Sequence, residues 1–166
     1  MVIIADTSPL NYLILIGHAE LLPLLFGGVV VPPAVYDELT RHGAPPVVRD
    51  FVLAGVRWLR VSAPVALSSG DPEEEALDDG EREAIALAGS FAAKVLLLLD
   101  DGKGRTVAER KGIPVLGTPG VPDLAATKHL IDLNSALDKL LETNFHVSLP
   151  LVNRLRIRDA ARRGAI

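Results

Sequence analysis

Short aliphatic runs that alternate with stretches of helical periodicity constrain the fold of this chain most strongly. The runs at residues 2–5, 29–31 and 95–99 are bounded by turn-forming or acidic residues and predict buried strands. Two further strands are expected at 57–61, where basic and apolar residues alternate as at a sheet edge, and at 114–116. Strands that alternate with helices are typical of a parallel sheet with helices on both faces, so the sequence predicts an α/β fold.

The segments between these strands predict helices, several of which begin at prolines and end at glycines. The expected helices are at 9–16, 18–26, 34–41, 46–54, 81–90 and 103–111. Residues 63–79 predict a surface loop with at most one helical turn, and the chain from about residue 121 predicts helices only. Because the sequence contains no internal repeat and no linker, we expect one domain over residues 1–166.

The composition excludes several classes of function. There are no cysteines, which rules out disulfides, zinc thiolates and cysteine nucleophiles. Aromatic residues make up only 4% of the chain, so an aromatic platform for base stacking is not expected. The net charge of -4 argues against a broad polyanion-binding surface, although a carboxylate metal site is itself acidic. With no signal peptide and no apolar run of bilayer length, we expect a cytoplasmic protein without a membrane segment.

Acidic residues directly follow two of the predicted strands. Asp6 ends the first strand, and Asp100 and Asp101 end the strongest one. Parallel strands present their carboxyl ends at one edge of a sheet, so these acids lie close together if the two strands are neighbours. Ser8 is expected to cap the following helix, with Pro9 at its first position. The alternative role for Asp6 is to help cap that helix.

Two glutamates on predicted helices are candidates for the same site. Glu38 lies beside Leu39, at the edge of the buried face of its helix, and Glu81 shares an apolar stripe with Ile85 and Ala88. A carboxylate on an apolar stripe needs a partner. The alternatives are a surface position for Glu38 and a favourable interaction of Glu81 with the helix dipole.

Four or five carboxylates in one crevice would repel one another and raise each other's pKa values, so the cluster would favour a bound cation. Oxygen ligands without His or Cys suit Mg²⁺ or Mn²⁺ rather than zinc. Two such ions about 4 Å apart can activate water and stabilise the leaving oxygen of a phosphodiester. Metal-dependent hydrolysis is therefore the chemistry to test first.

Four segments, in order and at suitable spacing, resemble the PIN-domain superfamily of metal-dependent ribonucleases. These segments are residues 5–10, 35–39, 79–88 and 99–101, the last continuing through 104–108 and 112–118. The doubled aspartate and the Gly117-Thr118 turn resemble a little-characterised prokaryotic branch, related to the toxin nucleases of toxin–antitoxin pairs. The resemblance implies a three-layer α/β/α fold with a five-stranded parallel sheet in the order 3-2-1-4-5.

The resemblance also implies which residues form the site. The acids implied as catalytic metal ligands are Asp6, Glu38, Glu81 and Asp101. Asp100 would be a further metal ligand or an acid behind the ligands. Contacts to the RNA substrate are expected from Thr7, Ser8, Lys103 and Arg105, although the last two could equally be solvated helix charges. The third acid is Glu rather than Asp, which leaves the number of metal ions open.

Three other functions stay open on the sequence. A dinucleotide-binding site at 102–104 would need a third glycine where this chain has Val107. Asp100 and Asp101, which directly precede these residues, would also repel a pyrophosphate. A phospho-acceptor receiver domain would need an acid after Val61, where none follows. A catalytically silent binding module with the PIN fold would keep the acids but lose substrate access.

The remaining charged residues predict little about recognition. RNA is expected to be selected through its backbone and shape.

A solvated helix end is expected for the basic cluster of Arg154, Arg156, Arg158, Arg162 and Arg163. Ordinary surface or half-buried positions are expected for His18, His42, His129 and His146. The resemblance implies a homodimer, and the C-terminal helices could bury a dimer face or an antitoxin segment.

Overall fold

The computed structural model describes residues 1–67 and 70–164 and is organised around one five-stranded sheet. Its strands are β1 (Val2–Ala5), β2 (Val29–Val31), β3 (Leu59–Val61), β4 (Val95–Leu98) and β5 (Val115–Leu116). All pairings in the sheet are parallel, and the order is β3-β2-β1-β4-β5. The predicted 3-2-1-4-5 order is confirmed, so β1 lies beside β4 and β3 forms an edge.

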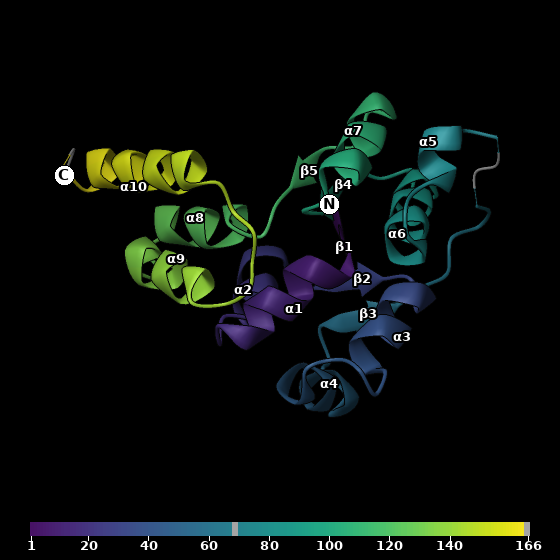
Figure 1. Cartoon of the computed structure of the whole chain (residues 1–166), viewed down its shortest axis with the longest axis horizontal. Coiled ribbons are helices and arrows are strands. Elements are labelled where there is room, and N and C mark those ends of the chain that lie inside the picture. Colours follow the sequence, from purple (N-terminus) through teal and green to yellow (C-terminus); the bar gives the residue numbers. More distant parts are fainter. Residues whose placement is uncertain (68–69, 165–166) are drawn as a thin grey trace.

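Helices cover both faces of this sheet, which makes three layers (Figure 1). One face is covered by α1 (Thr7–Leu15), α2 (Leu21–Phe26), α3 (Pro33–Thr40) and α4 (Pro46–Leu53). The other face is covered by α6 (Asp79–Gly89) and α7 (Gly102–Arg110). The predicted surface loop before α6 contains one short helix, α5 (Pro72–Glu75), which Asp71 caps.

The start of α1 differs from the sequence prediction. The helix begins at Thr7 and its N-cap position is occupied by Asp6, so the expectation that Ser8 caps it was wrong. The reason is that β1 ends at Ala5 and the chain turns into the helix after one extended residue. Pro9 still falls in the first turn, where a missing N–H breaks no helical hydrogen bond.

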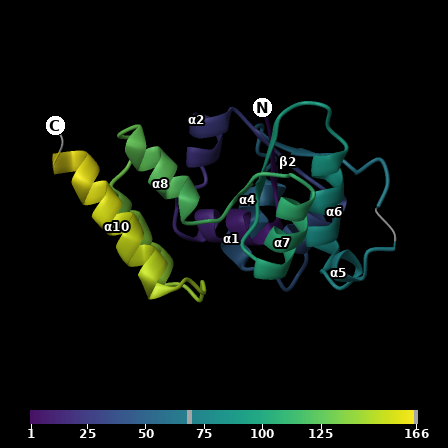
Figure 2. The ribbon, with the colours of Figure 1, turned by 90° about the horizontal axis from the view of Figure 1, so that it is seen from above.

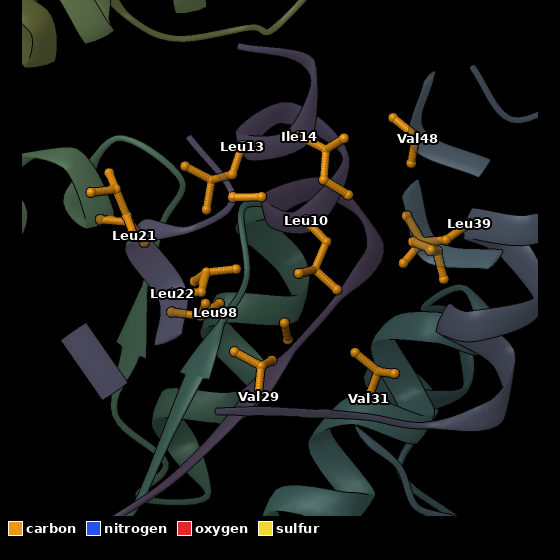
Figure 3. Packing of buried hydrophobic residues seen from close by; sticks show 14 of the residues in the cluster. Leu10, Leu13, Ile14, Leu21, Leu22, Val29, Val31, Leu39, Val48 and Leu98 are labelled. Atoms are coloured by element: carbon orange, nitrogen blue, oxygen red, sulfur yellow. The ribbon is translucent and has the colours of Figure 1, made fainter. Parts of the chain in front are cut away.

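The core consists of two aliphatic clusters separated by the sheet. Side chains of a strand alternate between the two faces, and Ile3 and Ala5 enter the first cluster while Ile4 enters the second. Figure 3 shows the first cluster, in which leucines of α1 and α2 pack over Val29, Val31 and Leu98. Each fully buried Leu or Ile contributes about 1.5–3 kcal/mol, so these clusters fix the strand ends that carry the acids.

The C-terminal part is helical, as predicted, and lies at the end of the molecule opposite α5 and α6 (Figures 1 and 2). It consists of α8 (Gly120–Thr127), α9 (Leu133–Leu141) and α10 (Leu149–Gly164). These helices share a third apolar cluster, formed by Leu133, Leu137, Val152 and Leu155. Within residues 1–67 and 70–164, no helix has the length and apolar character needed to cross a membrane.

The basic cluster of α10 is partly solvated, as expected, but three of its arginines also form ion pairs with buried acids. Arg158 and Arg162 both pair with the buried Asp123 of α8, the latter at 2.8 Å. Arg162 and Arg163 also pair with Asp159, which is buried, at 3.0 and 2.6 Å. The pairs with Asp159 follow from helical spacing within α10, whereas Asp123 lies on α8 and gives no local signal in the sequence.

Candidate functional site

A cleft of about 610 Å³ lies at the carboxyl ends of β1 and β4 and gathers acids from separate segments. Six carboxylates line it: Asp6, Glu38, Asp78, Glu81, Asp100 and Asp101. The pairing of β1 with β4 accounts for part of this gathering, since Ala5 is the register partner of Leu98 and the Asp6 N–H donates to the Leu98 carbonyl at 3.0 Å. The structure thus brings together all five acids that the sequence singled out, and adds Asp78.

Asp6 lies deepest among the acids. Its side chain is buried, and burial raises its pKa from 3.8 to about 7, with Asp78, Glu81 and Glu38 adding repulsion. The backbone N–H of Thr7 acts in the opposite direction by hydrogen bonding to the carboxylate. Gly80 makes this depth possible, because a Cβ there would lie 3.2 Å from Asp6 Oδ1.

Glu81 has a structural and a cleft-facing role at once. Its backbone N–H donates to Asp78 Oδ1 at 2.8 Å, and its Oε2 accepts from the Asp78 N–H at 3.3 Å, which forms a capping box for α6. The capping alternative is therefore present, but the side chain also lines the cleft. Burial, followed by the charges of Asp78 and Asp101, raises its pKa to about 7.

Glu38 is half-exposed in the lining of the cleft. Its Oε2 accepts a hydrogen bond from Thr7 Oγ1 at 2.7 Å, and its Oε1 pairs with Arg41 at 3.4 Å. Thr7 was expected to contact the RNA substrate, and its hydroxyl donates a hydrogen bond that positions Glu38. Helix α3 is itself held against α6 by Glu83, whose carboxylate accepts from the Ala34 N–H at 2.9 Å.

The doubled aspartate divides into two environments. Asp100 points toward the turn after β5 and accepts hydrogen bonds from the Thr118 N–H at 2.7 Å and the Thr118 hydroxyl at 2.6 Å. Burial raises its pKa, while Thr118, Arg105 and Ser8 oppose the shift. Asp101 is exposed at the cleft mouth and caps α7, accepting with Oδ1 from two backbone N–H groups at 2.8 and 3.0 Å.

The residues expected to contact substrate are not all in the cleft. Thr7 and Ser8 line it, whereas Lys103 is exposed on α7 and is not one of the described residues that do so. Arg105 donates to the Leu99 carbonyl at 3.1 Å and lies in an adjoining hollow with Asp100. Arg41 is the basic side chain that lines the cleft, and sequence analysis missed it.

A further part of the cleft lining was also missed by sequence analysis. It is formed by Asn11 and Tyr12 of α1 and by Asn144, Phe145 and His146 of the segment between α9 and α10. The α1 residues could have been found from helical spacing, because Ser8 and Tyr12 lie four apart. The second segment offered no signal, because only tertiary packing brings it to α1. His146, expected to be an ordinary surface residue, lines the cleft.

The donor chemistry of this cleft fits a divalent cation, although the side chains are not gathered as ligands. Among residues 1–67 and 70–164, no three Asp, Glu or His side chains are close enough together to hold a metal ion. Both Glu38 oxygens and one Asp101 oxygen already accept protein hydrogen bonds. Asp6 and Glu81, however, are buried carboxylates whose raised pKa values a cation would lower again.

The fold and the cleft together define a class: a parallel α/β/α domain with carboxylates clustered at the carboxyl ends of its central strands. A family model described as a PIN domain matches residues 2–160. The chain therefore belongs to the PIN-domain family, whose members are generally nucleases. No curated protein matches the chain.

Proposed function

We propose that this chain is a metal-dependent ribonuclease that hydrolyses RNA phosphodiester bonds in its acidic cleft. The observation that carries the proposal is the burial of Asp6 among Asp78, Glu81 and Glu38, which raises the Asp6 pKa to about 7. A protein stabilises such a group only when a proton or a cation neutralises it. Family membership makes a nuclease the class of enzyme that this site fits best.

The ligands we propose for Mg²⁺ or Mn²⁺ are Asp6, Glu38, Glu81 and Asp101, with Asp100 behind them. When bound, such an ion supplies a water of lowered pKa and offsets the phosphate charge. Thr7 orients Glu38, Asp78 orients Glu81, and Thr118 fixes Asp100, so these three carboxylates are held in place before substrate arrives. Arg41, which lines the cleft, is the basic residue suited to contact the RNA backbone.

The cellular role that we propose is that of a toxin nuclease with an antitoxin partner, acting as a homodimer. The support for it is the resemblance of the doubled aspartate to the branch related to such toxins. A catalytically silent binding module is the second candidate. It is favoured by one observation, that Glu38 and Asp101 already accept hydrogen bonds from the protein.

The test is Mn²⁺ titration by calorimetry, followed by incubation of a single-stranded RNA with each protein and Mn²⁺. Wild type is expected to bind Mn²⁺ and cleave, and Asp6→Asn to lose both. Asp101→Asn should lose cleavage but keep α7 stable, because Asn is as good an N-cap as Asp. The matched control is Asp37→Asn, which removes an exposed acid next to Glu38 and should leave both properties unchanged.

The outcomes separate the two candidates. Equal Mn²⁺ binding by wild type and Asp6→Asn would reject the metal site. Metal binding without cleavage of any RNA would favour the silent module. Cleavage that survives Asp101→Asn would show that the wrong acid of the pair was chosen.

A further inference from the structure

We propose that the part of the cleft lining formed by the rings of Tyr12 and Phe145 is a binding site for an unpaired nucleobase. This part of the lining, which we call the aromatic wall, also includes Asn11, Asn144 and His146. The inference rests on the proposed function, because it assigns the base of the same RNA whose phosphate would lie at the acids. The substrate that this site would accept is single-stranded RNA.

The two rings form a fixed pair. Their centroids are 4.7 Å apart and their planes are inclined at 67°, which is an edge-to-face arrangement. Both rings also pack against the first core cluster, and the Tyr12 hydroxyl donates to Asn144 Oδ1 at 3.1 Å. The Phe145 N–H donates to Thr143 Oγ1 at 3.1 Å, so the backbone that carries the second ring is held as well. A preorganised pair of this kind loses little conformational entropy when a ligand binds.

The pair is open to the cleft. Both side chains are only half-buried, and both line the same hollow as the acids. In an edge-to-face pair, the ring that points its edge at its partner has neither of its faces covered by that partner. An aromatic face beside solvent is the surface on which an unstacked base binds, and the interaction tolerates any base.

The polar groups around the rings suit the edge of a base. Asn11, Asn144 and His146 each carry nitrogen donors together with an acceptor, which is the combination that base edges offer in return. The acids line the same cleft, and burial, followed by the nearby charge of Asp100, raises the pKa of the Tyr12 hydroxyl. A base on the aromatic wall would therefore leave its own phosphates within reach of the acids.

Paired bases are excluded by the same arrangement. In a duplex the faces of the bases are covered by their neighbours, and stacking on a side chain requires the base to leave the helix. The site therefore selects for single-stranded segments, loops and ends. It replaces the sequence-based expectation that selection works through backbone and shape alone.

The test uses full-length protein and a single-stranded RNA of about ten nucleotides, with 2-aminopurine at alternate positions. Ca²⁺ replaces Mn²⁺, so that binding is measured apart from cleavage. Wild type is expected to quench the 2-aminopurine fluorescence on binding. Phe145→Leu keeps an apolar side chain for packing but removes the ring, and should weaken binding by about fivefold or more with little quenching left.

Two controls make the result specific. Phe91→Leu makes the same substitution against the second core cluster, away from the cleft, and should bind RNA as wild type does. Tyr12→Phe keeps the ring and removes the hydroxyl bond to Asn144, so quenching should persist. A duplex of the same sequence should bind more weakly than the single strand and show no dependence on Phe145.

A second measurement needs no variant and covers the case in which Phe145→Leu does not fold. Wild type is crosslinked to the RNA with 4-thiouridine replacing 2-aminopurine, and the adducts are mapped by mass spectrometry. Adducts are expected on peptides that contain Tyr12 or Phe145. Adducts confined to other surfaces would overturn the proposal.

Failure of this inference is distinguishable from failure of the ribonuclease proposal. RNA binding with normal affinity and quenching by folded Phe145→Leu would reject the aromatic wall, even if the protein cleaves. Quenching that Phe145→Leu abolishes, in a protein that never cleaves with Mg²⁺ or Mn²⁺, would support the wall and reject the nuclease. A wild type that binds no single-stranded RNA would reject the wall.

Discussion

At the scale of single residues, the acids of the cleft combine local structural roles with a shared electrostatic cost. Asp101 caps α7, and Asp78 and Glu81 form the capping box of α6. These bonds use backbone N–H groups that a helix end must satisfy in any case. The cap occupies Oδ1 of Asp101, so ligand binding by this residue has to use Oδ2 or share Oδ1 with the cap.

The cost of the cluster should appear in the pH dependence of stability. The Asp6 pKa is raised from 3.8 to about 7, so between these values the folded state holds a proton that the unfolded state has lost. Stability due to Asp6 is therefore present below about pH 4 and is lost as pH rises to about 7. An Asn side chain does not ionise, so Asp6→Asn avoids this decrease in stability. Without metal, the free energy of unfolding of Asp6→Asn should be about 2–4 kcal/mol higher than that of wild type at pH 8.

Urea unfolding at pH 4, 6 and 8 without metal checks this prediction. The difference in the free energy of unfolding between Asp6→Asn and wild type should increase with pH. Saturating Mg²⁺ should reduce this difference, because it stabilises wild type alone. If the free energies of unfolding of the two proteins change with pH in parallel, ionisation of Asp6 does not destabilise the folded state. Asp37→Asn is the control for removing one negative charge from the exposed surface.

At the scale of elements, sequence patterns predicted what depends on neighbours along the chain. The five strands, the helices between them and the inward position of Glu81 follow from periodicity and turn residues. The strand order came from the family resemblance, not from periodicity. The N-terminus of α1 was misplaced because Ser8 and Asp6 are both good caps, and only the abrupt end of β1 decides between them.

The aromatic wall could not have been predicted in this way. Its segment at 144–146 has no regular structure, and it meets Tyr12 through packing of residues far apart in the chain. The low aromatic content suggested that no ring would be available for binding. Composition counts residues but does not place them, and two of the few rings in this chain line one cleft.

Helix α7 offers a matched pair of glycines for testing how tightly the elements pack at the site. A Cβ at Gly104 would lie 3.0 Å from Leu99 Cδ2 and 3.6 Å from Glu81 Oε1. At Gly102, a Cβ would meet nothing within 4 Å in the described part of the chain. Gly104→Ala should cost about 1–3 kcal/mol through overpacking, whereas Gly102→Ala should be neutral or slightly stabilising.

Thermal unfolding of both glycine variants checks this expectation. Mn²⁺ binding should change little in Gly104→Ala, because the added Cβ would crowd Leu99 and make only an ordinary contact with Glu81. If the two variants have equal stability, α7 does not pack against the acid site as closely as these distances indicate.

At the scale of the whole molecule, the C-terminal helices are attached through their own small core and through charges. Helix α10 packs on α8 and α9, and Asp123 is the buried acid that joins α8 to two of its arginines. Removing one partner of a buried pair leaves the others without compensation. Asp123→Asn should therefore cost about 1–3 kcal/mol and should loosen α10 before the sheet.

Hydrogen exchange under native conditions is the measurement for this prediction. Amides of α10 should exchange faster in Asp123→Asn, while those of β1 and β4 keep their protection. The control is Asp138→Asn, which breaks an exposed pair between Asp138 of α9 and Arg156 of α10. This variant should change the free energy of unfolding by less than about 1 kcal/mol. Uniform loss of protection across the chain would mean that α10 and the sheet unfold as one unit.

The bond between Tyr12 and Asn144 has a consequence for the order in which this chain is made. Its two residues are separated by 132 positions, and synthesis delivers all the cleft acids before it delivers Asn144 and Phe145. Domains fold as units, so the cleft is complete only after both segments have been made. If the rings of Tyr12 and Phe145 hold an unpaired base, a growing chain that has not reached Phe145 lacks that contact with RNA.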